Sequence, residues 1–242
     1  MSSLGNCVVV VTGASQGIGR AIALGLAQKK AILVLVARNG SALQEVADMA
    51  RISSPHVVVH AADLAVDGAH TEIVKSLSHQ FGRLDILIHC AGAYSRGALE
   101  TASVDEFDRL YRINVRVPYG LTQSFLPLLK KRKGQIAFVN STQGIQAGAG
   151  VGQFAATQHA LKAIADSLRE EVNPDGVRVL SLYCGRTATP RMEAIYKLEG
   201  KEYKPELLLQ PEDIAEVLIN TLMMPRTAEV TNLNIRPLIK SY

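Results

Sequence analysis

A glycine-rich segment near the start of the chain has the form of a phosphate-binding loop. Thr12-Gly13-Ala14-Ser15-Gln16-Gly17-Ile18-Gly19 follows a run of valines and precedes a helical pattern. Glycines at such a junction let backbone N–H groups approach a diphosphate at the N-terminus of the helix. The next apolar run ends in Ala37-Arg38, and an arginine there pairs with a 2′-phosphate, whereas a carboxylate would accept from the ribose hydroxyl. The pattern predicts a dinucleotide site that favours NADP(H) over NAD(H); the alternative is that Arg38 only faces solvent.

The strands and helices that would position this loop alternate along almost the whole chain. Apolar, β-branched runs predict strands over 7–12, 32–36, 57–59, 84–88, 135–140, 177–183 and 230–235. Helical spacing predicts helices over 17–30, 41–51, 69–81, 104–133, 153–172 and 211–222. Continuously apolar strands separated by helices indicate a parallel sheet covered on both faces, so the fold class is α/β, a doubly wound Rossmann-type fold. No repeat or linker divides residues 1–242, which indicates a single domain.

Composition argues against several classes of protein. Of the 242 residues, 48% are hydrophobic and 20% charged, a balance typical of a folded globular chain. No apolar run approaches the ~18 residues of a membrane span, and the first residues do not resemble a signal peptide, so we expect a cytoplasmic protein without membrane contact. Three separated cysteines predict neither disulfides nor a metal site. The net charge is +4, and the one basic run, Lys130–Lys133 before Gly134, is typical of a helix C-terminus, so no nucleic-acid partner is expected.

Short motifs follow four of the predicted strands, and another lies in the long predicted helix: Asp63-Leu64, His89-Cys90-Ala91-Gly92, Ser141, Cys184-Gly185 with Thr189, and Asn114. With the glycine-rich loop, they resemble the short-chain dehydrogenase/reductase superfamily over residues 5–237, although Cys90 and Cys184 stand where the family has Asn and Pro. The resemblance implies a seven-stranded sheet of order 3-2-1-4-5-6-7 and a homo-dimer or homo-tetramer. It places NADP(H) against Gly13, Ser15, Gln16, Gly17, Ile18, Gly19, Arg38, Asp63, Leu64, Cys90, Ala91, Gly92, Gly185, Thr187 and Thr189.

The catalytic signature departs from that family. Its members carry Tyr-x-x-x-Lys on the helix after the Ser strand, but the matching segment here is Phe154-Ala155-Ala156-Thr157-Gln158. In the family the Tyr hydroxyl protonates the carbonyl oxygen, and the Lys lowers the pKa of that Tyr. Phe154 has no proton to give and Gln158 has no charge. Asn114 and Ser141 remain, either to hold a polar atom of the substrate or for packing alone.

Other side chains are expected near the substrate. Tyr94 and Tyr183 lie at or just beyond the ends of predicted strands, and Gln143 lies two residues after Ser141. Segment 186–209 matches the variable lid of the family, and its side chains Met192, Ile195, Tyr196, Leu198 and Tyr203 predict a small, apolar substrate, although simple helix packing would look the same. Lys162 lies one turn beyond Gln158 and is either a distant replacement for the acid or an exposed lysine.

Three classes of function follow from these residues. The first is an NADPH-dependent oxidoreductase whose substrate needs no proton from the enzyme, such as an imine, iminium or enone, and simple ketone reduction is then nearly absent. The second is a redox-silent enzyme of the same fold, an isomerase, dehydratase or cyclase. The third is a non-catalytic protein that binds the cofactor. We favour the first, and all three retain the dinucleotide site.

Overall fold

The apolar runs form one parallel sheet in the computed structural model, which describes residues 3–239. The strand order is β3-β2-β1-β4-β5-β6-β7, as the resemblance implied. Val10 lies opposite Val34 on one side and Leu87 on the other, so β1 is central. The strands are β1 (Val8–Thr12), β2 (Ile32–Ala37), β3 (Val57–Ala61), β4 (Ile86–His89), β5 (Gln135–Ser141), β6 (Arg178–Cys184) and β7 (Asn232–Ile235).

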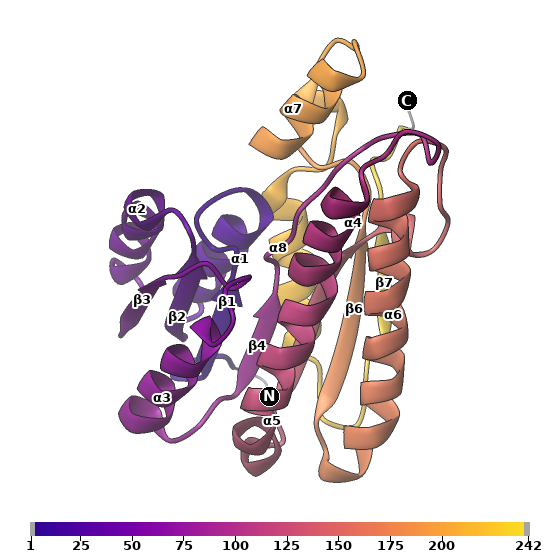
Figure 1. Ribbon diagram of the computed structural model, residues 1–242. Coiled ribbons are helices and arrows are strands. Elements are labelled where there is room, and N and C mark those ends of the chain that lie inside the picture. Colours follow the sequence, from indigo (N-terminus) through magenta and orange to yellow (C-terminus); the bar gives the residue numbers. More distant parts are fainter. Residues whose placement is uncertain (1–2, 240–242) are drawn as a thin grey trace.

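Helices cover both faces of the sheet (Figure 1). One face packs against α1 (Gly17–Gln28), α2 (Gly40–Arg51) and α8 (Pro211–Leu222). The opposite face packs against α3 (Ala69–Phe81), α5 (Val117–Arg132) and α6 (Gly152–Val172), with α4 (Val104–Tyr111) beside α6. A further helix, α7 (Pro190–Leu198), lies beyond one end of the sheet and not on either face (Figure 1).

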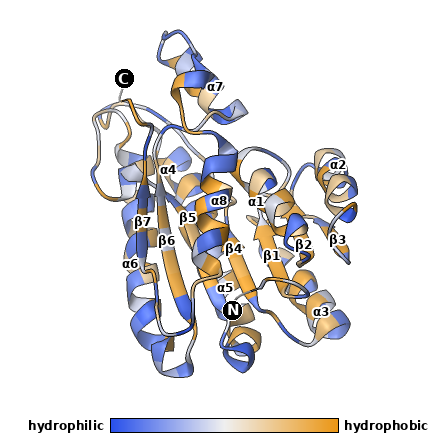
Figure 2. Ribbon diagram, turned by 180° about the vertical axis from the view of Figure 1, so that it is seen from behind, coloured by the Kyte–Doolittle hydropathy of each residue, from blue (hydrophilic) through white to orange (hydrophobic). Residues whose placement is uncertain are grey.

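The two-sided burial explains why the interior strands carry long apolar runs. Val9 and Val11 point into the core on the side of α1 and α8, whereas Val8 and Val10 point into the core on the side of α3 and α5. All four are fully buried, and each such side chain contributes roughly 1.5–3 kcal/mol through the hydrophobic effect. Figure 2 shows the resulting band of apolar strands between helices whose outer surfaces are hydrophilic.

The long helix predicted over 104–133 is interrupted near Asn114, the residue at which the resemblance implies a break in this helix. A π-helical turn, Arg112–Arg116, separates α4 from α5, and its bond runs from the Val117 N–H to the carbonyl of Arg112. Pro118 has no N–H and cannot donate to the carbonyl of Asn114, which removes one α-helical bond at this point. The turn displaces Asn114 inward, where its side chain is buried.

The basic run Lys130–Lys133 lies at the C-terminal end of α5. The run ends α5 at Lys133, which has a positive φ of 48°, and its members Lys130 and Arg132 pair with Asp175 and Asp85.

Within residues 3–239, no helix is long and apolar enough to cross a membrane and no cluster of ligating side chains would hold a metal. Met1 and Ser2, on which the expectation of a cytoplasmic protein partly rests, lie outside the described residues.

Candidate functional site

A cavity of about 920 Å³ opens at the carboxyl ends of the strands, beneath α7. Parallel sheets bind ligands at this edge, next to the point where the strand order reverses on either side of β1. Every residue predicted to contact the cofactor lines the cavity, from Gly13 to Thr189. So do Asn114, Ser141, Phe154 and Gln158, together with Tyr94, Gln143 and Met192.

The glycine-rich loop joins β1 to α1 in a conformation that requires glycine. Gly13 and Gly17 have φ values of 68° and 54°, and a Cβ on Gly13 would lie 2.8 Å from the Ala91 nitrogen. Thr12 fixes this close approach, because its Oγ1 accepts from the N–H groups of Cys90 and Ala91. No side chain caps the N-terminus of α1, so its first amides face the cavity. The loop therefore fits a diphosphate.

The far end of the cavity carries the groups that would hold an adenosine. Arg38 follows β2, is exposed, and forms no ion pair with a carboxylate among the residues described. Asn39 accepts a hydrogen bond from the Ala42 N–H and so caps α2, which fixes the backbone next to Arg38. Asp63 lies across from them after β3 and accepts from the Ala65 N–H at 3.0 Å. The free guanidinium of Arg38 is thus available to a phosphate.

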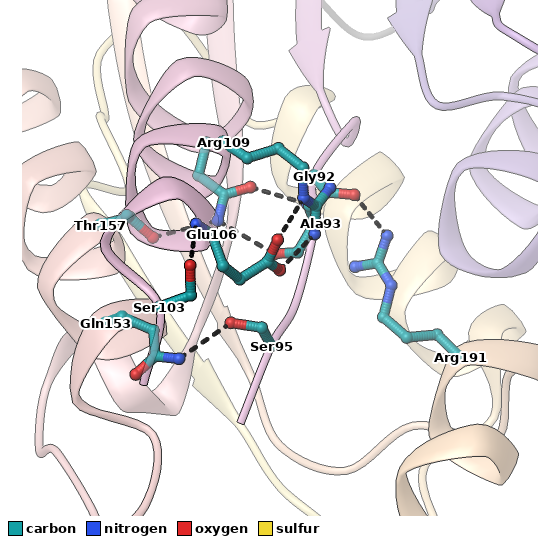
Figure 3. A network of polar contacts seen from close by, with 10 residues as sticks. Gly92, Ala93, Ser95, Ser103, Glu106, Arg109, Gln153, Thr157 and Arg191 are labelled. Atoms are coloured by element: carbon teal, nitrogen blue, oxygen red, sulfur yellow. Dashed lines mark hydrogen bonds and ion pairs between the residues drawn. The ribbon is translucent and has the colours of Figure 1, made fainter. Parts of the chain in front are cut away.

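Asn114 is fully engaged with the protein itself. Its Nδ2 donates to the Ala93 carbonyl and to Thr157 Oγ1, both at 3.0 Å, and its Oδ1 accepts from the Ala93 N–H at 2.7 Å. Thr157, which the sequence analysis did not single out, is completely buried and donates to the Phe154 carbonyl at 2.7 Å. Figure 3 shows Thr157 and Ala93 within this network. Asn114 therefore braces the segment after β4 against α6.

The position of the missing acid is apolar. Phe154 is 9% exposed and its ring packs edge-on against the Tyr94 ring, with 5.0 Å between centroids. Gln158 is also buried, and its Nε2 donates a long hydrogen bond of 3.4 Å to Thr157 Oγ1. Ser141 Oγ accepts from the Gln143 N–H, and its own hydrogen has no acceptor within the described chain. Ser141 and Gln158 can thus donate hydrogen bonds into the cavity.

None of the titratable groups near Phe154 is tuned as an acid. Burial raises the pKa of Tyr94, an effect that Arg96 only partly offsets. Burial also raises the pKa of Cys90 to about 12 and that of Cys184 further still, so both thiols are inert. Lys162 pairs with Asp166 at 2.6 Å and does not line the cavity. Lys162 is therefore an exposed structural lysine and not a distant acid.

The lid segment contains a buried ion cluster that sequence analysis missed. Glu199, at the end of α7, has a side chain only 4% exposed and pairs with Arg96, Arg186 and Lys201. Arg96 belongs to the loop after β4, so the cluster ties α7 to that loop. The base of the segment is closed by a bridge between Thr187 and Leu209. Charged groups therefore accompany the apolar Met192 and Ile195 in the wall of the cavity.

Two tyrosines predicted as substrate contacts lie elsewhere, so that part of the prediction is wrong. Tyr183 is 2% exposed and points from β6 toward the α6 side, where Lys162, Asp166 and Arg169 act on its pKa. Tyr196 is buried under the Arg186 guanidinium, 4.8 Å from its ring centroid, and packs against Tyr203. Neither residue lines the cavity, and the predicted lid residue Leu198 is 74% exposed.

Comparison with known proteins places this geometry in a family. Residues 7–199 match the short chain dehydrogenase family. An uncharacterized oxidoreductase of Staphylococcus epidermidis is 32% identical over 98% of this chain and 100% of its own length. An alcohol dehydrogenase from Thermococcus sibiricus, complexed with 5-hydroxy-NADP, superposes with a TM-score of 0.87 at 29% identity over 98% of both chains. L-sorbose reductase from Gluconobacter frateurii, complexed with NADPH and L-sorbose, has a TM-score of 0.88 at 26% identity over 97% of this chain and 96% of its own. The chain belongs to the short chain dehydrogenase family.

Proposed function

We propose that the protein is an NADPH-dependent oxidoreductase whose substrate takes up hydride without a proton from the enzyme. The observation that carries this proposal is Phe154, an apolar side chain in the cavity wall where the family's acid would stand. The cavity fits the cofactor, because the positive φ values of Gly13 and Gly17 leave room against Ala91 for a diphosphate and Arg38 is free for a 2′-phosphate. The two structural neighbours named above are complexed with 5-hydroxy-NADP and with NADPH.

The side chains around Phe154 support an electron-poor substrate. NADPH, when bound, would supply a hydride that adds to an iminium carbon to give a neutral amine, or to the β-carbon of an enone to give an enolate that water protonates afterwards. Phe154 and Tyr94 present a pair of aromatic rings to the cavity, a surface that attracts a delocalised cation and excludes water. Ser141 and Gln158 donate hydrogen bonds to a polar atom of the substrate, which positions it without changing its protonation state.

A matched substrate series tests this proposal. Consumption of NADPH is measured with a cyclic imine, an enone and the ketone of the same carbon skeleton. We expect turnover of the imine or the enone at a rate at least ~10²-fold above the ketone, the lower limit of what a general acid contributes. Equal rates for ketone and imine would refute the proposal. Tight NADPH binding without turnover of any of the three would favour the redox-silent or non-catalytic alternatives.

We further propose that residues 186–209 act as the substrate lid and that the protein forms a homo-dimer or homo-tetramer in the cytoplasm. The outward face of α6 carries the exposed small side chains Ala156, Ala163 and Ser167, which permit close approach of a second copy. Light scattering at micromolar concentration measures the mass in solution, and a monomer would contradict this assembly.

A further inference from the structure

Arg191 crosses the crevice in which the cofactor is proposed to bind. It belongs to the first turn of α7, two residues after Thr189, and its Nη2 donates to the carbonyl of Gly92 at 2.6 Å. Figure 3 shows the side chain reaching from its helix to the segment after β4. On the other side of the crevice, the Thr189 methyl group lies 3.0 Å from the position of a Cβ on Gly17. Arg191 and Thr189 thus bring the start of α7 against both the segment after β4 and the β1–α1 loop.

The charge of Arg191 is not compensated within the described part of the protein. Within residues 3–239 its hydrogen-bond partner is the neutral Gly92 carbonyl, and it forms no ion pair with a carboxylate there. Burial lowers the pKa of Arg191, and the positive charge of Arg38 lowers it further, against an opposing effect of Cys90. An arginine nevertheless stays protonated in proteins. Two like charges held in one cavity are unfavourable unless an anion lies between them.

The exposed part of the Arg191 side chain faces the cavity. Its side chain is accessible to solvent and lines the cavity together with the first turn of α1. A diphosphate that accepts from the amides of that turn would lie in the crevice that Arg191 spans. A phosphate oxygen is a stronger acceptor for a guanidinium than a backbone carbonyl, because the bond is charge-assisted on both sides. The Gly92 carbonyl is therefore the weaker of the two available partners.

We propose that Arg191 is a cofactor-binding residue carried by the lid, which pairs with the diphosphate of NADP(H) and thereby holds α7 over the cavity. This inference rests on the proposed function, since it needs a bound dinucleotide. It differs from the role of Arg38, because the diphosphate is common to NADPH and NADH whereas the 2′-phosphate is not. It also makes substrate binding dependent on the cofactor, because α7 carries Met192 and Ile195 into the cavity wall.

Affinities of single variants for both dinucleotides test the assignment. Fluorescence titration gives the Kd of NADPH and NADH for the wild-type protein and for Arg191→Gln, Arg38→Gln and Arg51→Gln. Arg51 is the matched control, since it lies at the far end of α2 and outside the cavity. We expect Arg191→Gln to weaken both dinucleotides by a similar factor of roughly ten, Arg38→Gln to weaken only NADPH, and Arg51→Gln to weaken neither. Arg191→Lys should retain part of the affinity.

Two further measurements separate a phosphate contact from a general loosening of the lid. Adenosine 2′-monophosphate has no diphosphate, so its affinity should fall in Arg38→Gln and stay unchanged in Arg191→Gln. Addition of NADP should slow hydrogen exchange of the α7 amides in the wild-type protein but not in Arg191→Gln. Unchanged dinucleotide affinity of Arg191→Gln, or a loss confined to NADPH, would overturn this inference alone. Failure of the wild-type protein to bind either dinucleotide would overturn the proposed function and this inference with it.

Discussion

Restoring an acid and its neighbouring cation should convert this protein into a carbonyl reductase. The double substitution Phe154→Tyr with Gln158→Lys recreates the pattern that the family uses for proton transfer. Phe154 lines the cavity together with Ser141, so the added hydroxyl enters open space and does not displace packed core atoms. Gln158 also lines the cavity, and Thr157 Oγ1 lies 3.4 Å from its Nε2, so an acceptor is at hand for the new ammonium group. The fold should therefore tolerate both changes.

The size of the effect follows from the chemistry of the two side chains. A positioned general acid contributes ~10²–10⁴-fold in rate, which corresponds to roughly 3–5 kcal/mol of activation free energy. Phe154→Tyr alone should give less, because the new phenol keeps a pKa near its ordinary ~10 without a neighbouring cation. Gln158→Lys alone should give no gain, because a cation at this position has no acid to tune. The two substitutions are thus expected to be strongly non-additive.

The assay is NADPH consumption with a panel of aldehydes and ketones, at equal NADPH saturation and with thermal unfolding as the check on folding. We expect the double variant to exceed the wild-type protein by ~10²-fold or more on at least one carbonyl substrate. If the wild-type protein already reduces the same carbonyls as fast as the double variant, another residue supplies the proton and the interpretation of Phe154 is wrong. Tyr94→Phe in the wild-type background then shows whether Tyr94 is that residue.

Three other perturbations test single parts of the structure. Arg38→Gln should weaken NADPH by roughly tenfold and leave NADH unchanged in fluorescence titration, so equal losses for both would show that Arg38 does not contact the 2′-phosphate. Burial lowers the pKa of His89 from 6.5 to about 3, so the unfolded chain binds a proton that the folded protein does not. The free energy of unfolding should therefore fall as the pH decreases below 6.5, by about 2 kcal/mol at pH 5. Urea unfolding above pH 6.5 and at pH 5 measures this loss of stability, and His89→Asn should remove most of the pH dependence. Asp85→Ala should cost about 3 kcal/mol in the same assay, because Asp85 is 1% exposed, accepts from the Val8 N–H at 2.8 Å and pairs with Arg132; Asp85→Asn should cost less.

The fold was predictable because the interior strands β1, β2 and β4 are apolar on both faces. A run such as Val8 to Val11 has no polar face, so only a sheet with helices packed on both faces can bury it. The alternation of strands with helices then implies that the strands are parallel. The break between α4 and α5 follows from the resemblance at Asn114 and not from helical periodicity, because it depends on contacts between Asn114 and the distant Ala93. Pro118 was the one local signal of that break.

The site was predictable where backbone topology alone decides position. Residues that directly follow parallel strands meet at one edge, which is why Arg38, Asp63 and Gly92 line one cavity. Tyr183 lies away from the cavity because side chains alternate along β6. It shares one face of the strand with Val179 and Ser181, whereas Leu182 and Cys184 lie on the opposite face. On α7, Met192 and Ile195 face the cavity, whereas the Tyr196 ring packs under the Arg186 guanidinium.

The distribution of charge distinguishes binding of a cofactor from mere retention of a fold. At the lid, Arg96 and Arg186 both pair with the buried Glu199, as expected of a structural cluster. At the cofactor crevice, Arg38 and Arg191 pair with no carboxylate among the residues described. A bound polyanion would compensate both charges. The acid and its cation are absent from a site whose phosphate-binding charges are complete, which points to a protein that binds NADP(H) and has given up one step of the family's chemistry.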